Sequence, residues 1–199
     1  MEFTADAEGV RERKKRQTRQ ALNRAAISLV QEQGLGGVTA EDIARAAGVS
    51  PRTFFNYFPT KEAALAGLGG EVAERVDAAL AARPAEESLW ESVRWLGIRL
   101  AQLSLEDRDL WLARRRLLRE QPPVAAVMLG GQRSFEMAVT AAVVRAAAER
   151  GETSPTWRPR MMALVVLDAL RVASQQAEQP DGVVPLMGEV LDAMEPALG

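Results

Sequence analysis

The sequence contains no cysteine and no histidine. Without thiols the chain cannot form disulfides or zinc-thiolate sites, and without imidazole it lacks Cys-His and Ser-His-Asp nucleophile systems. Lysine occurs only at Lys14, Lys15 and Lys61. Carboxylate pairs such as Glu86-Glu87 and Asp107-Asp109 remain for acid/base chemistry, and we expect them to be solvated. The composition therefore predicts a protein that is not an enzyme and needs no metal or cofactor.

Long apolar segments are also missing. No run approaches the roughly 18 uninterrupted apolar residues that a membrane span requires. The N-terminus is charged and lacks the apolar core of a signal peptide. These observations predict a soluble, cytoplasmic protein without a membrane partner.

Basic residues are concentrated near the N-terminus. Residues 11 to 61 carry ten Lys/Arg against four Asp/Glu, whereas residues 62 to 199 carry fifteen against twenty. A local basic excess of this kind is typical of a segment that binds the phosphate backbone of nucleic acid. The alternative is a solvated basic helix without function.

Helical periodicity dominates the chain, and sustained apolar/polar alternation is absent, so the fold class is predicted to be all-α. Caps, glycines and prolines predict where the helices lie. They are expected at about 13–33, 39–47, 51–58, 61–82, 89–103, 107–121, 123–150, 155–177 and 183–198, with a break left open at Gly130-Gly131.

Two short predicted helices form a helix-turn-helix between Thr39 and Lys61. Thr39 and Asp42 make a capping-box pattern at the first helix. Gly48 permits a left-handed turn, and Ser50-Pro51 caps and starts the second helix. Two helices joined by a four-residue turn that contains glycine are typical of a DNA-binding motif.

The second helix offers side chains for both a core and a DNA groove. Phe54 and Phe58 are expected to face the core. Arg52 suits guanine O6/N7, or else is a solvated arginine, and Asn56 suits adenine or a phosphate. Phe55 either touches a thymine methyl group or belongs to a second layer of the core.

A longer string of residues resembles the N-terminal domain of the TetR family of repressors. It comprises Gly37-Val38-Thr39, Asp42-Ile43-Ala44, Ala47-Gly48-Val49-Ser50, Thr53-Phe54-Phe55-Asn56-Tyr57-Phe58 and Lys61-Glu62. The resemblance covers about residues 13 to 68. It implies nine or ten helices, a homodimer formed through the last two long helices, and a pocket in the C-terminal domain whose ligand controls DNA affinity.

The family's DNA contacts carry over to matching positions of this chain. Phosphate-side positions would be Thr39, Ser50, Thr53, Tyr57 and Lys61, and base-facing positions Pro51, Arg52 and Asn56. The chain departs from the family at Phe55, where many members have tyrosine, and at Ala40, where a second threonine is common. The basic run Arg13 to Arg19, which includes Arg16, either enters the adjacent minor groove or stays disordered.

The C-terminal half carries methionine and aromatic residues but no recognisable motif. Such residues suit an adaptable apolar cavity, and ordinary core is the alternative for each of them. The segment Trp111 to Glu120 is similar to family members that bind acyl-CoA thioesters or related lipid-like molecules. The candidate ligand-binding residues are Trp90, Leu96, Trp111, Arg115, Phe135 and Met161, with Arg115 suited to an anionic head group.

These observations predict three parts: a flexible N-terminal arm (1–12), a three-helix bundle with the helix-turn-helix (13–60), and a helical ligand-binding and dimerisation domain (61–199) with about nine helices in all. The expected function is a ligand-responsive regulator, bound as a homodimer to a palindromic DNA operator and released by a small apolar or amphipathic effector. The rivals are an enzyme and a helical small-molecule-binding protein that does not bind DNA.

Overall fold

The computed structural model describes residues 9–67 and 72–198, and these residues contain helices and turns but no strand. The all-α prediction is confirmed. The α-helices are α1 (Val10–Gln33), α2 (Ala40–Ala46), α3 (Pro51–Tyr57), α4 (Lys61–Ala66), α5 (Val72–Ala81), α6 (Leu89–Leu105), α7 (Arg108–Glu120), α8 (Pro122–Glu149), α9 (Trp157–Gln176) and α10 (Val183–Leu198), with 3-10 turns η2 (Leu35–Gly37) and η3 (Pro180–Gly182).

Most helix ends follow the predicted signals, but one prediction was wrong. The single helix expected over 61–82 is two helices, because Gly67 adopts a left-handed φ of +73° and ends α4. The break left open at Gly130-Gly131 does not occur, since α8 continues through both glycines. None of the helices in the described ranges is long and apolar enough to cross a membrane.

The chain divides into two compact units. The N-terminal unit comprises Met1–Gly70 and Leu117–Gly131, and the C-terminal unit comprises Glu71–Arg116 and Gln132–Gly199. Helices α7 and α8 therefore each contribute residues to both units. The predicted DNA-binding domain (13–60) and ligand-binding domain (61–199) were defined by function, and the compact units do not test them. Both domains stay predictions.

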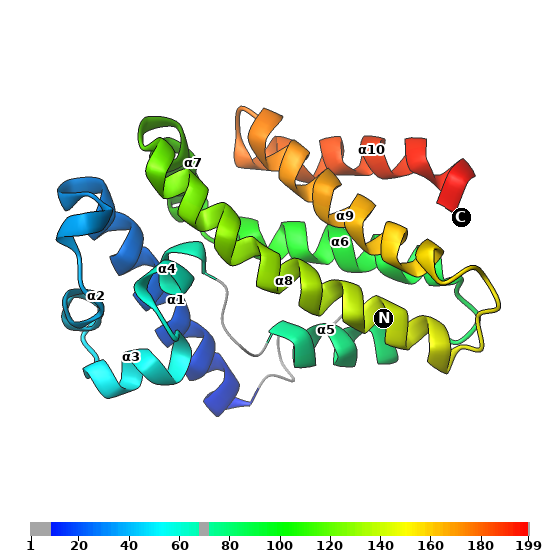
Figure 1. Cartoon of the computed structure of the whole chain (residues 1–199), viewed down its shortest axis with the longest axis horizontal. Helices are drawn as coiled ribbons and strands as arrows, with labels where there is room; N and C mark the ends of the chain where they lie inside the picture. Colours follow the sequence, from blue (N-terminus) through cyan, green and yellow to red (C-terminus); the bar gives the residue numbers. More distant parts are fainter. Residues whose placement is uncertain (1–8, 68–71, 199) are drawn as a thin grey trace. The chain divides into compact units, whose positions relative to one another are not determined.

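The N-terminal unit is built around α1, against which α2 and α4 pack, while α3 packs on α2 (Figure 1). Its fully buried large residues include Leu22, Ile27, Val30, Val38, Ile43, Phe54, Phe58, Leu65 and Leu117. The burial of Phe54 and Phe58 confirms their predicted core positions.

The C-terminal unit has its core where α6, α9 and α10 pack together (Figure 1). Capping fixes the start of α6, where Ser88 and Glu91 form a capping box. The buried residues of α6 include Leu89, Val93 and Leu96.

Candidate nucleic-acid interface

The helix-turn-helix begins at a capping box on α2. The Asp42 amide donates to Thr39 Oγ1 (3.1 Å), and the Thr39 amide donates to Asp42 Oδ2 (3.1 Å). The Thr39 hydroxyl, then the Thr39 amide, hold the pKa of Asp42 below its ordinary value, and Arg45 adds to this effect. The cap at the start of α2 is therefore formed by residues that are three positions apart in the sequence.

The turn between α2 and α3 follows from glycine and serine. Gly48 has a left-handed φ of +70°, and the Val49 amide donates a hydrogen bond back to the Ala44 carbonyl (2.9 Å). Ser50 Oγ then accepts the Thr53 amide (3.0 Å) at the start of α3, with Pro51 at its first position. The predicted turn chemistry is present in full.

Helix α3 presents one face away from the core. Pro51, Arg52 and Asn56 are exposed on it. Phe55 is 53% exposed, and its ring packs edge-to-face with the Phe54 ring (centroids 5.2 Å apart, planes at 86°). Of the two roles left open for Phe55, the structure therefore favours the outward one.

Three hydroxyl groups at the predicted phosphate-side positions, those of Thr39, Ser50 and Thr53, already have partners in the chain. Thr39 Oγ1 donates to Asp42 Oδ2 (2.6 Å), and the Ser50 and Thr53 hydroxyls share a hydrogen bond (2.8 Å). Thr39 and Ser50 are exposed, while Thr53 and Tyr57 are half-buried. A phosphate would therefore join or replace existing hydrogen bonds at these hydroxyls.

Lys61 contacts the protein backbone. Its Nζ donates to the Leu35 and Val38 carbonyls, both at 2.8 Å. Two of its three ammonium protons thus hold the segment that leads into α2. This structural role was not visible in the sequence, and the phosphate contact of Lys61 stays a prediction.

The basic run at the N-terminus lies within α1. Arg13 to Arg19 are helical, as expected for a helix over 13–33, and Arg16 is half-buried, so the disorder left open there is not present. Entry of this run into a minor groove stays a prediction. Of the predicted flexible arm at 1–12, residues 1 to 8 lie outside the described residues, and α1 begins at Val10.

Sequence reasoning missed Asn23, which is buried on α1. Its Nδ2 donates to the Ala64 carbonyl (2.6 Å) and to the Leu65 carbonyl (3.1 Å) near the end of α4. The last carbonyls of a helix lack partners within the helix, and this amide donates to two of them, beside the Gly67 amide that also donates to the Ala64 carbonyl (3.1 Å). A polar residue at an inward position of α1 was the available signal.

The predicted ligand-binding residues are in several environments. Trp90, Leu96 and Trp111 are buried, and Phe135 is half-buried against the core of the C-terminal unit. The Arg115 guanidinium carbon lies 5.3 Å from the centroid of the Trp111 ring. Met161 is 43% exposed on the outward face of α9, so the structure does not bring it together with the buried candidates.

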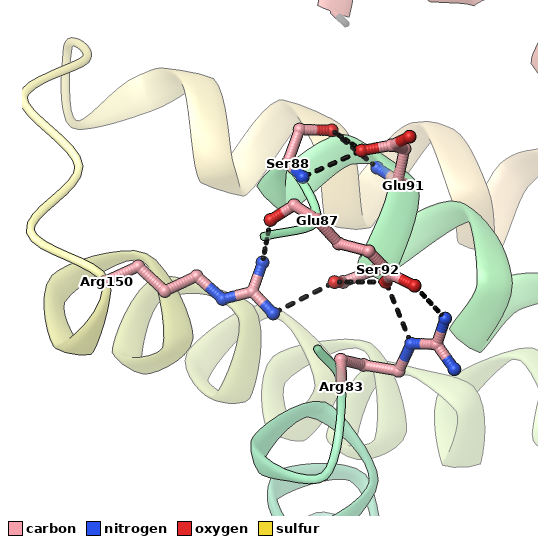
Figure 2. A network of polar contacts seen from close by, with 6 residues as sticks. All are labelled: Arg83, Glu87, Ser88, Glu91, Ser92 and Arg150. Atoms are coloured by element: carbon pink, nitrogen blue, oxygen red, sulfur yellow. Dashed lines mark hydrogen bonds and ion pairs between the residues drawn. The ribbon is translucent and has the colours of Figure 1, made fainter. Parts of the chain in front are cut away.

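A polar network in the C-terminal unit joins the loop after α5 to α6 and α8. Arg83 Nε donates to Glu87 Oε2 (3.0 Å), as does the Ser92 hydroxyl (3.1 Å). Arg150 donates to Ser92 Oγ (2.9 Å) and to the Glu87 carbonyl (3.2 Å), and Figure 2 shows this arrangement. The expectation that Glu87 is solvated was therefore wrong, because two arginines and Ser92 surround it.

Comparison with known proteins identifies the family. The family model described as "Bacterial regulatory proteins, tetR family" matches residues 22–67. The HTH-type transcriptional regulator TcmR of Streptomyces glaucescens is 35% identical over 179 residues, which cover 87% of this chain and 78% of TcmR. The chain belongs to the TetR family.

Solved structures agree with this TetR assignment. FadR of Thermus thermophilus, a TetR-family repressor in complex with lauroyl-CoA, is 26% identical with a TM-score of 0.51, covering 89% of this chain and 93% of FadR. GusR of Salmonella enterica shares the fold, with 21% identity and a TM-score of 0.51 over 91% of this chain and 95% of GusR. The chain is a TetR-family transcriptional regulator with a DNA-binding helix-turn-helix.

Proposed function

We propose that this regulator is a repressor: a homodimer that places two copies of α3 in successive major grooves of a palindromic operator and leaves the DNA when an effector binds the C-terminal unit. The observation that carries the proposal is the exposed face of α3, where Arg52, Phe55 and Asn56 project beside a capped turn. A bacterial protein that binds chromosomal DNA acts in the cytoplasm, so we infer a cytoplasmic location.

The dimensions and chemistry of α3 suit a major groove. Its seven residues span roughly 10 Å, against a groove about 12 Å wide. Arg52 suits bidentate donation to guanine, Asn56 suits adenine, and the Phe55 ring suits a thymine methyl group. Thr39, Ser50, Thr53, Tyr57, Lys61 and Arg16 are proposed to hold phosphates.

Exposed apolar side chains on the last two helices support dimer formation. A surface helix normally presents polar side chains to water. Here four large apolar side chains are exposed instead, namely Trp157, Met161 and Leu164 of α9 and Met194 of α10. A second copy that covers them would remove this apolar surface from water.

Three observations support an amphipathic, acyl-CoA-like effector. The similar FadR of Thermus thermophilus is in complex with lauroyl-CoA. Trp90 Nε1 is buried without a hydrogen-bond partner among the described residues, so an effector oxygen would satisfy it. The Arg115 guanidinium, held over Trp111, offers a cation for an anionic head group.

Fluorescence anisotropy with a labelled duplex from the region upstream of the chain's own gene tests the proposal. We expect two protomers per duplex and an affinity that falls as salt rises, because phosphate contacts release counterions. Lauroyl-CoA is the first effector probe and should weaken binding. Undetectable or salt-insensitive binding would refute the proposal, and binding of lauroyl-CoA without DNA binding would favour the small-molecule-binding alternative.

A further inference from the structure

Helix α9 has two distinct faces. The face that packs in the C-terminal unit contains Pro159, Met162, Ala163, Val166, Leu167, Ala169 and Ala173, all of which are buried. The opposite face contains Trp157, Arg160, Met161, Leu164, Asp168 and Val172, all of which are exposed. Arg171 lies beside Asp168 and pairs with it on the same face.

Residues of complementary chemistry lie at equal distances on either side of Leu164 on the exposed face. Four residues to either side of Leu164 are Arg160 and Asp168, which carry opposite charges. Seven residues to either side are Trp157 and Arg171, an aromatic ring and a guanidinium. Positions four and seven residues from a helical residue lie on its own face.

We propose that the two-fold axis of the homodimer passes beside Leu164, so that the α9 helices of two copies pack antiparallel; this rests on the dimer of the proposed function. In that arrangement Leu164 meets the partner's Leu164. Arg160 reaches the partner's Asp168, and Trp157 stacks with the partner's Arg171. Each polar pair forms twice, because a two-fold interface is self-complementary.

Charge complementarity identifies a second copy as the occupant of this face. An unrelated partner would have to supply the same charges and the same apolar centre in reverse order, whereas a copy of the chain supplies them by symmetry. The exposed Asp168–Arg171 pair within one helix is weak and readily exchanged. Ion pairs of this kind fix the register and the choice of partner more than the affinity.

The absence of cysteine allows a direct test by cross-linking of the full-length chain. A residue beside the axis lies next to its own copy, and a disulfide needs Cα atoms within about 7 Å. We expect Leu164→Cys to form a disulfide-linked dimer under mild oxidation. The matched control is Val172→Cys, since Val172 is 36% exposed and Leu164 40%. At 1.5 Å per residue, antiparallel helices would hold the two copies of position 172 about 24 Å apart, too far to link.

The outcomes separate this inference from the proposed dimer. Cross-linking at 164 alone supports the axis. A wild-type chain that sediments as a monomer overturns both proposals. A wild-type dimer in which position 172 links, both positions link or neither links overturns the axis and leaves the dimer standing.

A charge exchange tests the Arg160–Asp168 pair independently. Arg160→Asp leaves two acidic residues on the face, and Asp168→Arg leaves only basic ones. We expect each variant to dissociate at least tenfold more readily than wild type, and an equimolar mixture to form heterodimers. Circular dichroism of each variant checks that it is folded. Homodimers as stable as wild type, or a mixture that stays monomeric, would overturn the pairing.

Discussion

Gly97 of α6 lies so close to Val166 of α9 that a Cβ atom on Gly97 would sit 2.2 Å from Val166 Cγ1. The Met187 methyl group of α10 would be 2.7 Å from the same atom. Gly97 therefore allows α6 to approach both helices at the centre of the C-terminal unit.

Replacement of Gly97 should reveal this close packing. We expect Gly97→Ala to lower the free energy of unfolding by about 1–3 kcal/mol, because the added methyl group forces neighbours apart. The control is Gly188→Ala on α10, where a Cβ atom meets nothing within 4 Å. That change should stabilise the helix by up to about 1 kcal/mol. Urea unfolding checks both, and equal effects would refute the packing argument.

Asn23 should contribute to stability in a way that an exposed asparagine does not. Asn23→Ala removes the amide that donates to the Ala64 and Leu65 carbonyls. The expected loss is about 1–3 kcal/mol in the free energy of unfolding. Asn56→Ala, on the exposed face of α3, should leave the unfolding midpoint unchanged. An Asn23→Ala midpoint equal to wild type would contradict the assignment.

Arg52 should read one base pair. If it donates to guanine, Arg52→Ala should cost about 1–3 kcal/mol on the natural operator. The cost should be much smaller on a duplex in which that guanine pair is exchanged. Binding isotherms for wild type and variant on both duplexes measure the difference. The same loss on every duplex would instead identify Arg52 as a phosphate contact.

Lys61 should affect folding as well as DNA binding. Lys61→Met keeps the apolar stem but removes the donor to the Leu35 and Val38 carbonyls. We expect a stability loss of about 1–3 kcal/mol together with weaker operator binding. Lys14→Met, at an exposed position of α1, is the stability control. Weaker DNA binding with an unchanged unfolding midpoint would mean that the ammonium group serves only a phosphate.

The Asp42 cap should make stability depend on pH in acid. Because hydrogen bonds lower the folded-state pKa of Asp42, its contribution is complete above the unfolded pKa of about 4 and is lost as pH falls through the folded value. The difference in urea midpoint between wild type and Asp42→Asn should therefore shrink from pH 6 to acid. Glu152→Gln, at an exposed carboxylate, is the control for the loss of one negative charge. A difference that grows in acid would reverse the sign we infer.

Local chemistry made the helix-turn-helix predictable. Thr39, Gly48 and Ser50 act on backbone groups within a few residues, so the sequence contains both the cap and its target. The resemblance to the TetR family rested on the same segment. By contrast, the prediction of a single helix over 61–82 overlooked Gly67, whose left-handed conformation ends α4.

Contacts between distant residues were not predictable from periodicity or caps. Asn23 meets carbonyls 41 and 42 positions away, and Lys61 reaches back 23 and 26 positions. The surroundings of Glu87 likewise depend on Arg150, 63 positions later. Such contacts exist only after the helices have packed, so sequence reasoning assigned these residues to solvent, to DNA or to no role.

The network around Glu87 also limits how this regulator can be recombined with its relatives. A hybrid whose crossover falls between Ser92 and Arg150 would inherit the loop from one parent and the arginine that completes it from the other. Unless both parents carry the same residues, the hybrid would leave a partly buried guanidinium or carboxylate unpaired. Crossovers in such hybrids should therefore fall outside residues 83 to 150.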